Sequence, residues 1–67
     1  MTRTYIIEKD KKQVLEYHRS LSDAKSHLKE INEPNCSVLA IHGAYYGEGF
    51  HKYRVYYKNG KFVKESV

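Results

Sequence analysis

The sequence predicts a two-layer α+β fold, in which one helix packs on one face of a five-stranded antiparallel sheet in the order ββαβββ. Three observations carry this prediction. The pair Asn59-Gly60 separates two alternating segments and is a strong hairpin signal. A stripe of apolar residues at helical spacing lies between Ser20 and Asn32, and segments rich in β-forming residues stand on both sides of it. The chain has 67 residues, which suits a single compact domain over residues 1–67.

The first 19 residues are expected to form a β-hairpin. Thr4–Glu8 and Val14–His18 are rich in β-forming residues, and the charged segment Lys9–Gln13 between them is typical of a solvated turn. An alternative interpretation of this turn is a surface that docks on a partner.

The only convincing helix spans Ser20–Asn32. Ser20 is a good N-cap residue and Asp23 places an acid in the first turn, where it suits the helix dipole. Pro34 ends the helix, because the residue before a proline is disfavoured in the α region. The stripe expected to pack on the sheet has spacings of three, four and three, and it consists of Leu21, Ala24, Leu28 and Ile31.

A two-residue turn at Asn59-Gly60 determines the register of the C-terminal hairpin. Lys58 then faces Lys61, with Tyr57 facing Phe62 and Tyr56 facing Val63 one and two positions further on. Alternation divides the side chains into two sets. The expected core set is Tyr53, Val55, Tyr57 and Phe62, and the expected exposed set is Lys52, Arg54, Tyr56, Lys58, Lys61 and Val63.

The third strand, Ser37–Gly43, is expected to pair with the strand that follows the loop Ala44–Phe50. Its register is ambiguous. Placing Leu39 opposite Val55 and Ile41 opposite Tyr53 buries the larger apolar residues, so this register is preferred over the one shifted by a single residue. The smaller Val38 and Ala40, with His42, would then lie beside Lys52 and Arg54. The order of the strands across the sheet stays open.

The positive charge belongs to one end of the chain. The formal net charge is +4, and the basic and acidic residues of 1–50 cancel, so the charge arises from residues 51–67. Lysines that alternate on an exposed strand often only prevent edge pairing. Here the charge is unbalanced and interleaved with tyrosines, which favours binding to nucleic acid or to a nucleoprotein partner. The candidate binding residues on this basis are Lys52, Arg54, Tyr56, Lys58, Lys61 and Lys64, with Tyr45 and Tyr46 of the preceding loop.

Enzymatic, metal and cofactor sites are not expected. Cys36 is the single cysteine, so it forms no intramolecular disulfide, and no activating group is evident beside it. The histidines at 18, 27, 42 and 51, with Glu48, lack the tight spacing of a zinc motif. There is no apolar run of about 18 residues and no signal-peptide segment. These patterns predict a cytoplasmic protein that does not act at a membrane.

Three segments resemble the ninth family of small type I-F anti-CRISPR proteins of phages and mobile elements. They are Tyr5-Ile-Ile7, Ser20-Leu-Ser-x-Ala-Lys25 and a tyrosine-rich strand ending in Lys58-x-Gly-Lys61-x-Val63. The resemblance does not extend to Glu33–Phe50. It implies five antiparallel strands and one helix. It also implies inhibition in a bacterial host, by binding to Cas7-type backbone subunits of the crRNA-guided surveillance complex, with lysines that attract DNA non-specifically. Lys25, Lys58 and Lys61 fall in the matching motifs.

Three hypotheses follow for function. The first is a non-enzymatic inhibitor that docks on a host nucleoprotein complex and blocks access of target DNA. The second is a small module that binds nucleic acid directly through the basic face of the sheet. The third is an interaction protein, monomeric or weakly dimeric, that self-associates by burying Tyr56, Val63, Val38 and Ala40 between copies.

Overall fold

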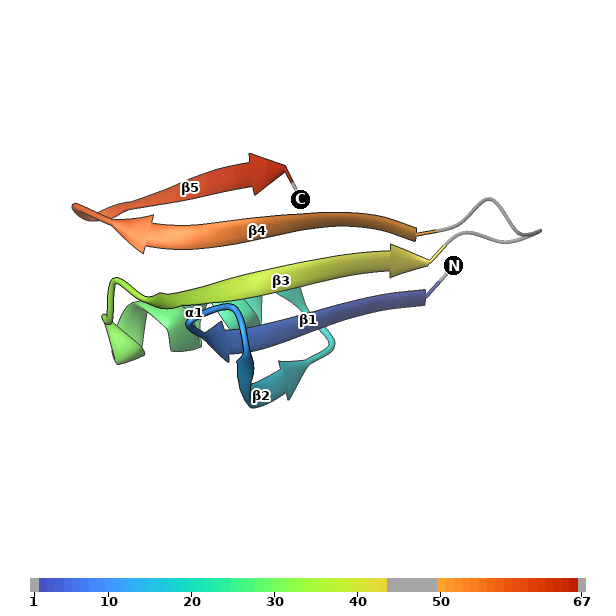
Figure 1. The fold of residues 1–67 in the computed structure, drawn as a ribbon, viewed down its shortest axis with the longest axis horizontal. Helices are drawn as coiled ribbons and strands as arrows, with labels where there is room; N and C mark the ends of the chain where they lie inside the picture. Colours follow the sequence, from blue (N-terminus) through green and yellow to red (C-terminus); the bar gives the residue numbers. More distant parts are fainter. Residues whose placement is uncertain (1, 44–49, 67) are drawn as a thin grey trace.

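The structure is a computed structural model and describes residues 2–43 and 50–66 (Figure 1). Neighbouring strands are antiparallel throughout, and the helix packs against the sheet. This confirms the predicted α+β class and the order ββαβββ. The elements are β1 (Thr2–Lys9), β2 (Gln13–His18), α1 (Leu21–Ile31), β3 (Cys36–Gly43), β4 (Phe50–Lys58) and β5 (Lys61–Ser66).

The strand order is β2-β1-β3-β4-β5, so β1 and β3 lie side by side and join the two hairpins. Tyr5 lies opposite Ala40 and Ile7 lies opposite Val38 in this central pair. The two outer strands, β2 and β5, are the edges of the sheet. This arrangement places the basic C-terminal hairpin at one edge and the N-terminal hairpin at the other.

The C-terminal hairpin has the predicted turn and register. Asn59 and Gly60 both have positive φ angles, of 52° and 76°, as a type I′ turn requires. Lys58 faces Lys61, and the next two pairs along the strands also match the prediction. Local turn chemistry therefore determines how β4 pairs with β5.

The helix α1 begins after Ser20, whose backbone is extended although its side chain makes no capping hydrogen bond. It ends at Asn32, which adopts the left-handed conformation and donates its backbone N–H to the carbonyl oxygen of Leu28 at 3.0 Å. Ala24 and Leu28 are buried against the sheet, with Leu21 and Ile31 partly buried beside them, so the predicted stripe is confirmed. No helix within residues 2–43 and 50–66 is long and apolar enough to cross a membrane.

The predicted register between β3 and β4 is wrong by one residue. Val38 pairs with Val55, and Ala40 pairs with Tyr53. The reason lies in the neighbouring strands, because Ala40 stands between the large rings of Tyr5 and Tyr53 across three strands. A small residue fits this position beneath the helix and a larger one would overfill it.

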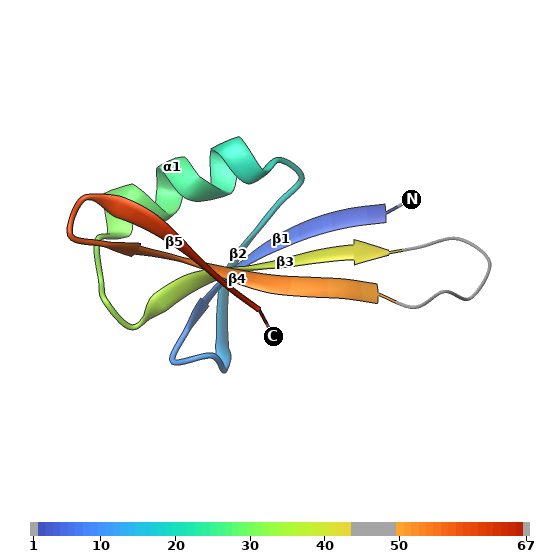
Figure 2. The same cartoon turned by 90° about the horizontal axis from the view of Figure 1, so that it is seen from above.

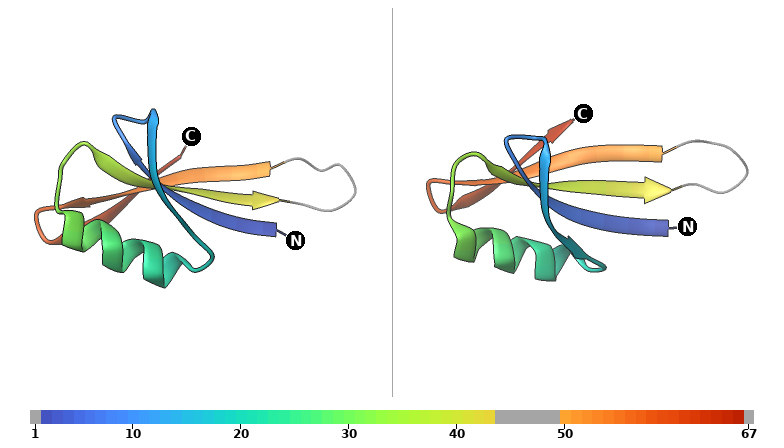
Figure 3. Two further views of the ribbon diagram at one scale, coloured as in Figure 1. Left: turned by 90° about the horizontal axis from the view of Figure 1, so that it is seen from below. Right: turned by 60° about the horizontal axis from the view of Figure 1, so that its bottom comes forward.

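The third strand therefore turns to each face the side chains expected on the other, whereas β4 and β5 keep their expected faces. The face under α1, here called the helix side, holds the core residues Tyr5, Ile7, Val38, Ala40 and Val55 together with Ala24, Leu28 and Cys36. The opposite face, here called the open face, carries Leu39 and Ile41. Figures 2 and 3 show α1 on one side of the sheet and the turn between β1 and β2 bent towards the other side.

Candidate partner-binding surface

Three lysines of the C-terminal hairpin lie on the open face as predicted. Lys58 and Lys61 face one another across the turn, and Lys52 precedes them on the same side of β4. All three are exposed. Within the described part of the chain, none of them forms an ion pair with a carboxylate. They are charges that a partner can neutralise without breaking an ion pair.

Lys64 and Lys25 lie on the other side of the sheet. Lys64 is opposite Val55, a core residue, and its Nζ lies 4.4 Å from the centroid of the Tyr53 ring. The assignment of Lys64 to the face that carries Lys52 is therefore wrong, because alternation in β5 turns it towards the helix side. Lys25 of α1 extends over the ring of Phe62 at 5.2 Å. The β4–β5 hairpin is basic on both of its sides.

Arg54 lies on the open face, but its charge is already paired. Its Nη1 donates to Glu8 Oε1 at 2.8 Å and to Ser37 Oγ at 3.3 Å. The side chains of Arg54 and Glu8 are only 12% and 11% exposed. This pair connects β4 to β1 across β3, so Arg54 contributes little free positive charge to the surface.

Tyr56 is buried, at 8% exposure, which corrects its prediction as an exposed aromatic on the basic face. The bent turn between β1 and β2 explains the burial. The backbone N–H of Asp10 donates to the carbonyl oxygen of Asn35 at 2.9 Å, and the Asn35 side chain returns a bond to Asp10 Oδ1 at 3.1 Å. Asp10, Lys11, Pro34, Asn35 and Tyr56 line one shallow hollow. Lys58 Nζ lies 4.7 Å above the Tyr56 ring, which leaves the ring unsuited to stacking on bases.

Tyr45 and Tyr46, the other predicted aromatics, lie outside the described residues. Exposed aromatic side chains occur elsewhere. Tyr17 at the β2 edge is 68% exposed, and Phe62 in β5 is 40% exposed.

An aliphatic patch that was not predicted from the sequence lies in the middle of the open face. Ile6, Leu39 and Ile41 are partly exposed there, and the register places Ile6 between Tyr17 and Leu39. Ile41 lies directly opposite Lys52, so the patch adjoins the free positive charge. The unbroken apolar run Tyr5-Ile-Ile7 was a signal for it, because a strand with one solvated face alternates apolar and polar residues.

The single cysteine has the environment of a structural thiol. Cys36 is 1% exposed, and its Sγ lies 3.6 Å from Glu33 Oε2. Burial, followed by the nearby carboxylate of Glu33, raises the pKa of the thiol. Since the thiolate is the nucleophile, these surroundings disfavour reaction at Cys36.

His42 and His51 are direct cross-strand partners, whereas the register expected from the sequence would have placed His42 opposite Lys52. Nε2 of His42 lies 3.3 Å from the Tyr5 hydroxyl, and its ring packs edge-on against Tyr53 at 5.5 Å. This histidine is engaged in the packing of the helix side.

Comparisons with known proteins do not assign a family. Protein-family models, curated proteins and solved structures give no significant match to the chain. The resemblance to anti-CRISPR proteins therefore stays a prediction. The candidate surface rests on its geometry, with Lys52, Lys58 and Lys61 beside the aliphatic patch on the open face.

Proposed function

We propose that this chain is a small non-enzymatic inhibitor that docks on a nucleoprotein complex of its host. Following the family resemblance, the proposed complex is a crRNA-guided surveillance complex, and docking on its Cas7-type subunits blocks target DNA. The observation that carries the proposal is the set of exposed lysines without a carboxylate partner in the described structure, Lys52, Lys58 and Lys61.

The aliphatic patch supports a protein component in the partner. Ile6, Leu39 and Ile41 are apolar, whereas a phosphate backbone offers charge and hydrogen-bond acceptors. A surface that combines apolar side chains with lysines suits binding to a partner protein that itself holds nucleic acid. The same patch changes the self-association hypothesis, because Val38 and Ala40 lie in the core and Ile6, Leu39 and Ile41 occupy the open face in their place.

Direct binding of nucleic acid is the second candidate function. It is favoured by lysines on both sides of the hairpin, with Lys64 of β5 and Lys25 of α1 opposite the first three. Such binding needs no protein partner and falls steeply between about 50 and 200 mM salt. A protein interface with apolar contacts persists over that range.

The experiment is a pulldown from a bacterial lysate that contains an active type I CRISPR system, at about 150 mM salt, with and without nuclease. The inhibitor proposal predicts recovery of Cas proteins that survives nuclease treatment. Loss of every partner after nuclease would contradict it and support direct nucleic-acid binding. Recovery of the bait alone would also contradict it.

Two matched variants test the surface itself. Lys58→Glu with Lys61→Glu changes the hairpin, and Arg19→Glu with Lys29→Glu changes exposed basic residues after β2 and in α1. Each double substitution lowers the formal net charge from +4 to 0, so non-specific charge effects are equal. We expect only the hairpin variant to lose the partner, with both variants folded by circular dichroism. Equal retention of the partner by both variants would exclude the basic hairpin as the docking surface.

A further inference from the structure

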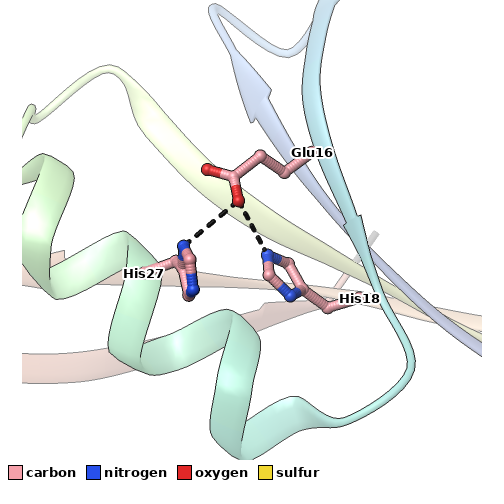
Figure 4. Close-up of side chains that lie close together, drawn as sticks. All are labelled: Glu16, His18 and His27. Carbon is pink, nitrogen blue, oxygen red and sulfur yellow. Dashed lines mark hydrogen bonds and ion pairs between the residues drawn. The ribbon is translucent and has the colours of Figure 1, made fainter.

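Glu16, His18 and His27 meet where α1 crosses the edge strand β2 (Figure 4). Glu16 and His18 are two residues apart in β2, so their side chains point to the same side of the sheet. The register confirms this, since they lie opposite the core residues Ile7 and Tyr5. His27 reaches the same point from α1. The three residues form no short sequence motif, because they come from a strand and a helix that the fold brings together.

The potential ligand atoms of these side chains already converge. Glu16 Oε1 lies 3.1 Å from His18 Nε2 and 3.1 Å from His27 Nδ1. The two imidazole rings are 4.6 Å apart between centroids. All three ligand atoms lie within 4.8 Å of one another. Among the residues that the structure describes, these three form the group of His, Cys, Asp or Glu side chains that could hold a metal ion.

We propose that Glu16, His18 and His27 form a binding site for a divalent transition-metal ion, for which Zn²⁺ is the best fit. Two imidazole nitrogens and one carboxylate oxygen are a ligand set that zinc accepts, with a fourth position left for water. Metal to ligand distances of about 2.0–2.2 Å and tetrahedral angles put neighbouring ligand atoms about 3.4 Å apart. The two separations from Glu16 Oε1, of 3.1 Å each, are close to this value, and the two imidazole nitrogens lie within 4.8 Å of one another.

The exposure of the three side chains leaves room for the fourth ligand. His18 is 14% exposed, whereas Glu16 and His27 are 38% and 47% exposed. An ion between them therefore contacts solvent on one side. It would also link α1 to β2, an edge strand whose side chains are otherwise mostly exposed. Metal binding should consequently stabilise the folded protein, since the unfolded chain does not hold the three ligands together.

Hydrogen bonding is the competing explanation of the cluster. A carboxylate oxygen can accept one N–H from each imidazole, and this arrangement needs no ion. A metal ion replaces both of these protons, because ligating nitrogens must carry a free lone pair. The two explanations differ in what happens when zinc is added to the chelator-treated protein.

The first test is a titration of the full chain with ZnCl₂ in competition with a chromogenic zinc indicator. We expect one ion per chain, a melting temperature that rises on binding, and reversal of that rise by EDTA. Mg²⁺ should neither bind nor compete, because it favours sites made of oxygen ligands. Absence of zinc binding at about 100 μM, or the same response to Mg²⁺ as to Zn²⁺, would overturn the proposal.

Single substitutions test whether zinc binds at these three residues. His27→Gln and Glu16→Gln remove one ligand each at partly exposed positions, so both chains should fold in EDTA, as far-UV circular dichroism can verify. Each should bind zinc at least about 10-fold more weakly, since even an outer-shell change can cost that much. His51→Gln is the matched control, because it removes an exposed histidine of β4, a strand that β1 and β3 separate from β2. Unchanged affinity in His27→Gln, or equal loss in His51→Gln, would show that zinc binds elsewhere and overturn the assignment.

Discussion

The ion pair between Glu8 and Arg54 is a contact that single substitutions should reveal clearly. Both side chains are nearly buried on the open face, and Ser37 shares the same guanidinium nitrogen. Arg54→Met leaves the carboxylate of Glu8 without its cation in a poorly solvated place. We predict a loss of about 2–3 kcal/mol in the free energy of unfolding, measured by urea denaturation.

The matched control for this prediction removes both charges together. Glu8→Leu with Arg54→Met leaves no buried charge, and such replacements are often close to neutral. The double variant should therefore be more stable than Arg54→Met alone, with a coupling of about 1 kcal/mol or more. A double variant less stable than the single one would show that the pair is not the source of the effect.

Cys36 supplies a second prediction at the scale of single residues, through its raised pKa. A raised pKa means that folding favours the neutral thiol over the thiolate. The neutral thiol stabilises the fold fully below the pKa of the thiol in the unfolded chain. This stabilisation is lost as the pH rises through the pKa of the thiol in the folded protein. We expect stability to fall between about pH 8 and 10 and to fall less in Cys36→Ala, as urea denaturation over this range can measure. Parallel curves for the two proteins would contradict the assignment to Cys36.

Among the elements, the β4–β5 hairpin combines a favourable turn with an unfavourable pair. Lys58 and Lys61 are directly opposite one another, and like charges in such positions destabilise a sheet. Lys61→Glu alone creates an opposite-charge pair, so we predict a gain of about 0.3 kcal/mol in stability. Partner capture should nevertheless weaken. A thermal melt and the pulldown together check this, and a loss of stability accompanying the loss of binding would contradict it.

The elements differ in how far they could be predicted from sequence. The Asn59-Gly60 turn and the stripe on α1 depend on residues close in the chain, and both were predicted correctly. The β3–β4 register depends on Tyr5, which fills the space beside Ala40 from a distant strand. The register predicted from the sequence depends on the sizes of Leu39 and Val38 alone, and this choice takes no account of Tyr5.

The candidate surface shows the same division. The exposed lysines Lys52, Lys58 and Lys61 follow from alternation in a hairpin of known register. The burial of Tyr56 and the ion pair of Arg54 do not follow from alternation. Both depend on β1 and the turn after it, and Glu8 of β1 lies 46 residues from Arg54 in the sequence. That turn bends over the open face after a register shift between Ile7 and Glu8. A bulge of this kind has no strong local signal in the sequence.

At the scale of the whole molecule, lysines lie on two opposite sides of the β4–β5 hairpin. Lys52, Lys58 and Lys61 share the open face, while Lys64 and Lys25 share the helix side. One flat partner can contact only one of these sets. A partner that encloses the hairpin contacts both sets, so the number of contacts distinguishes the two modes of binding.

The salt dependence of nucleic-acid binding measures that number. Each neutralised phosphate contributes about −0.7 to −0.9 to the slope of log K against log salt concentration. Binding through the three open-face lysines alone therefore predicts a slope of about −2 to −3, and enclosure of the hairpin with all five predicts about −3.5 to −4.5. Fluorescence anisotropy with a labelled oligonucleotide measures the slope for the wild type and for Lys64→Gln. If only the open face binds, Lys64→Gln leaves the slope unchanged, whereas a slope shallower by about one unit would place nucleic acid on the helix side as well.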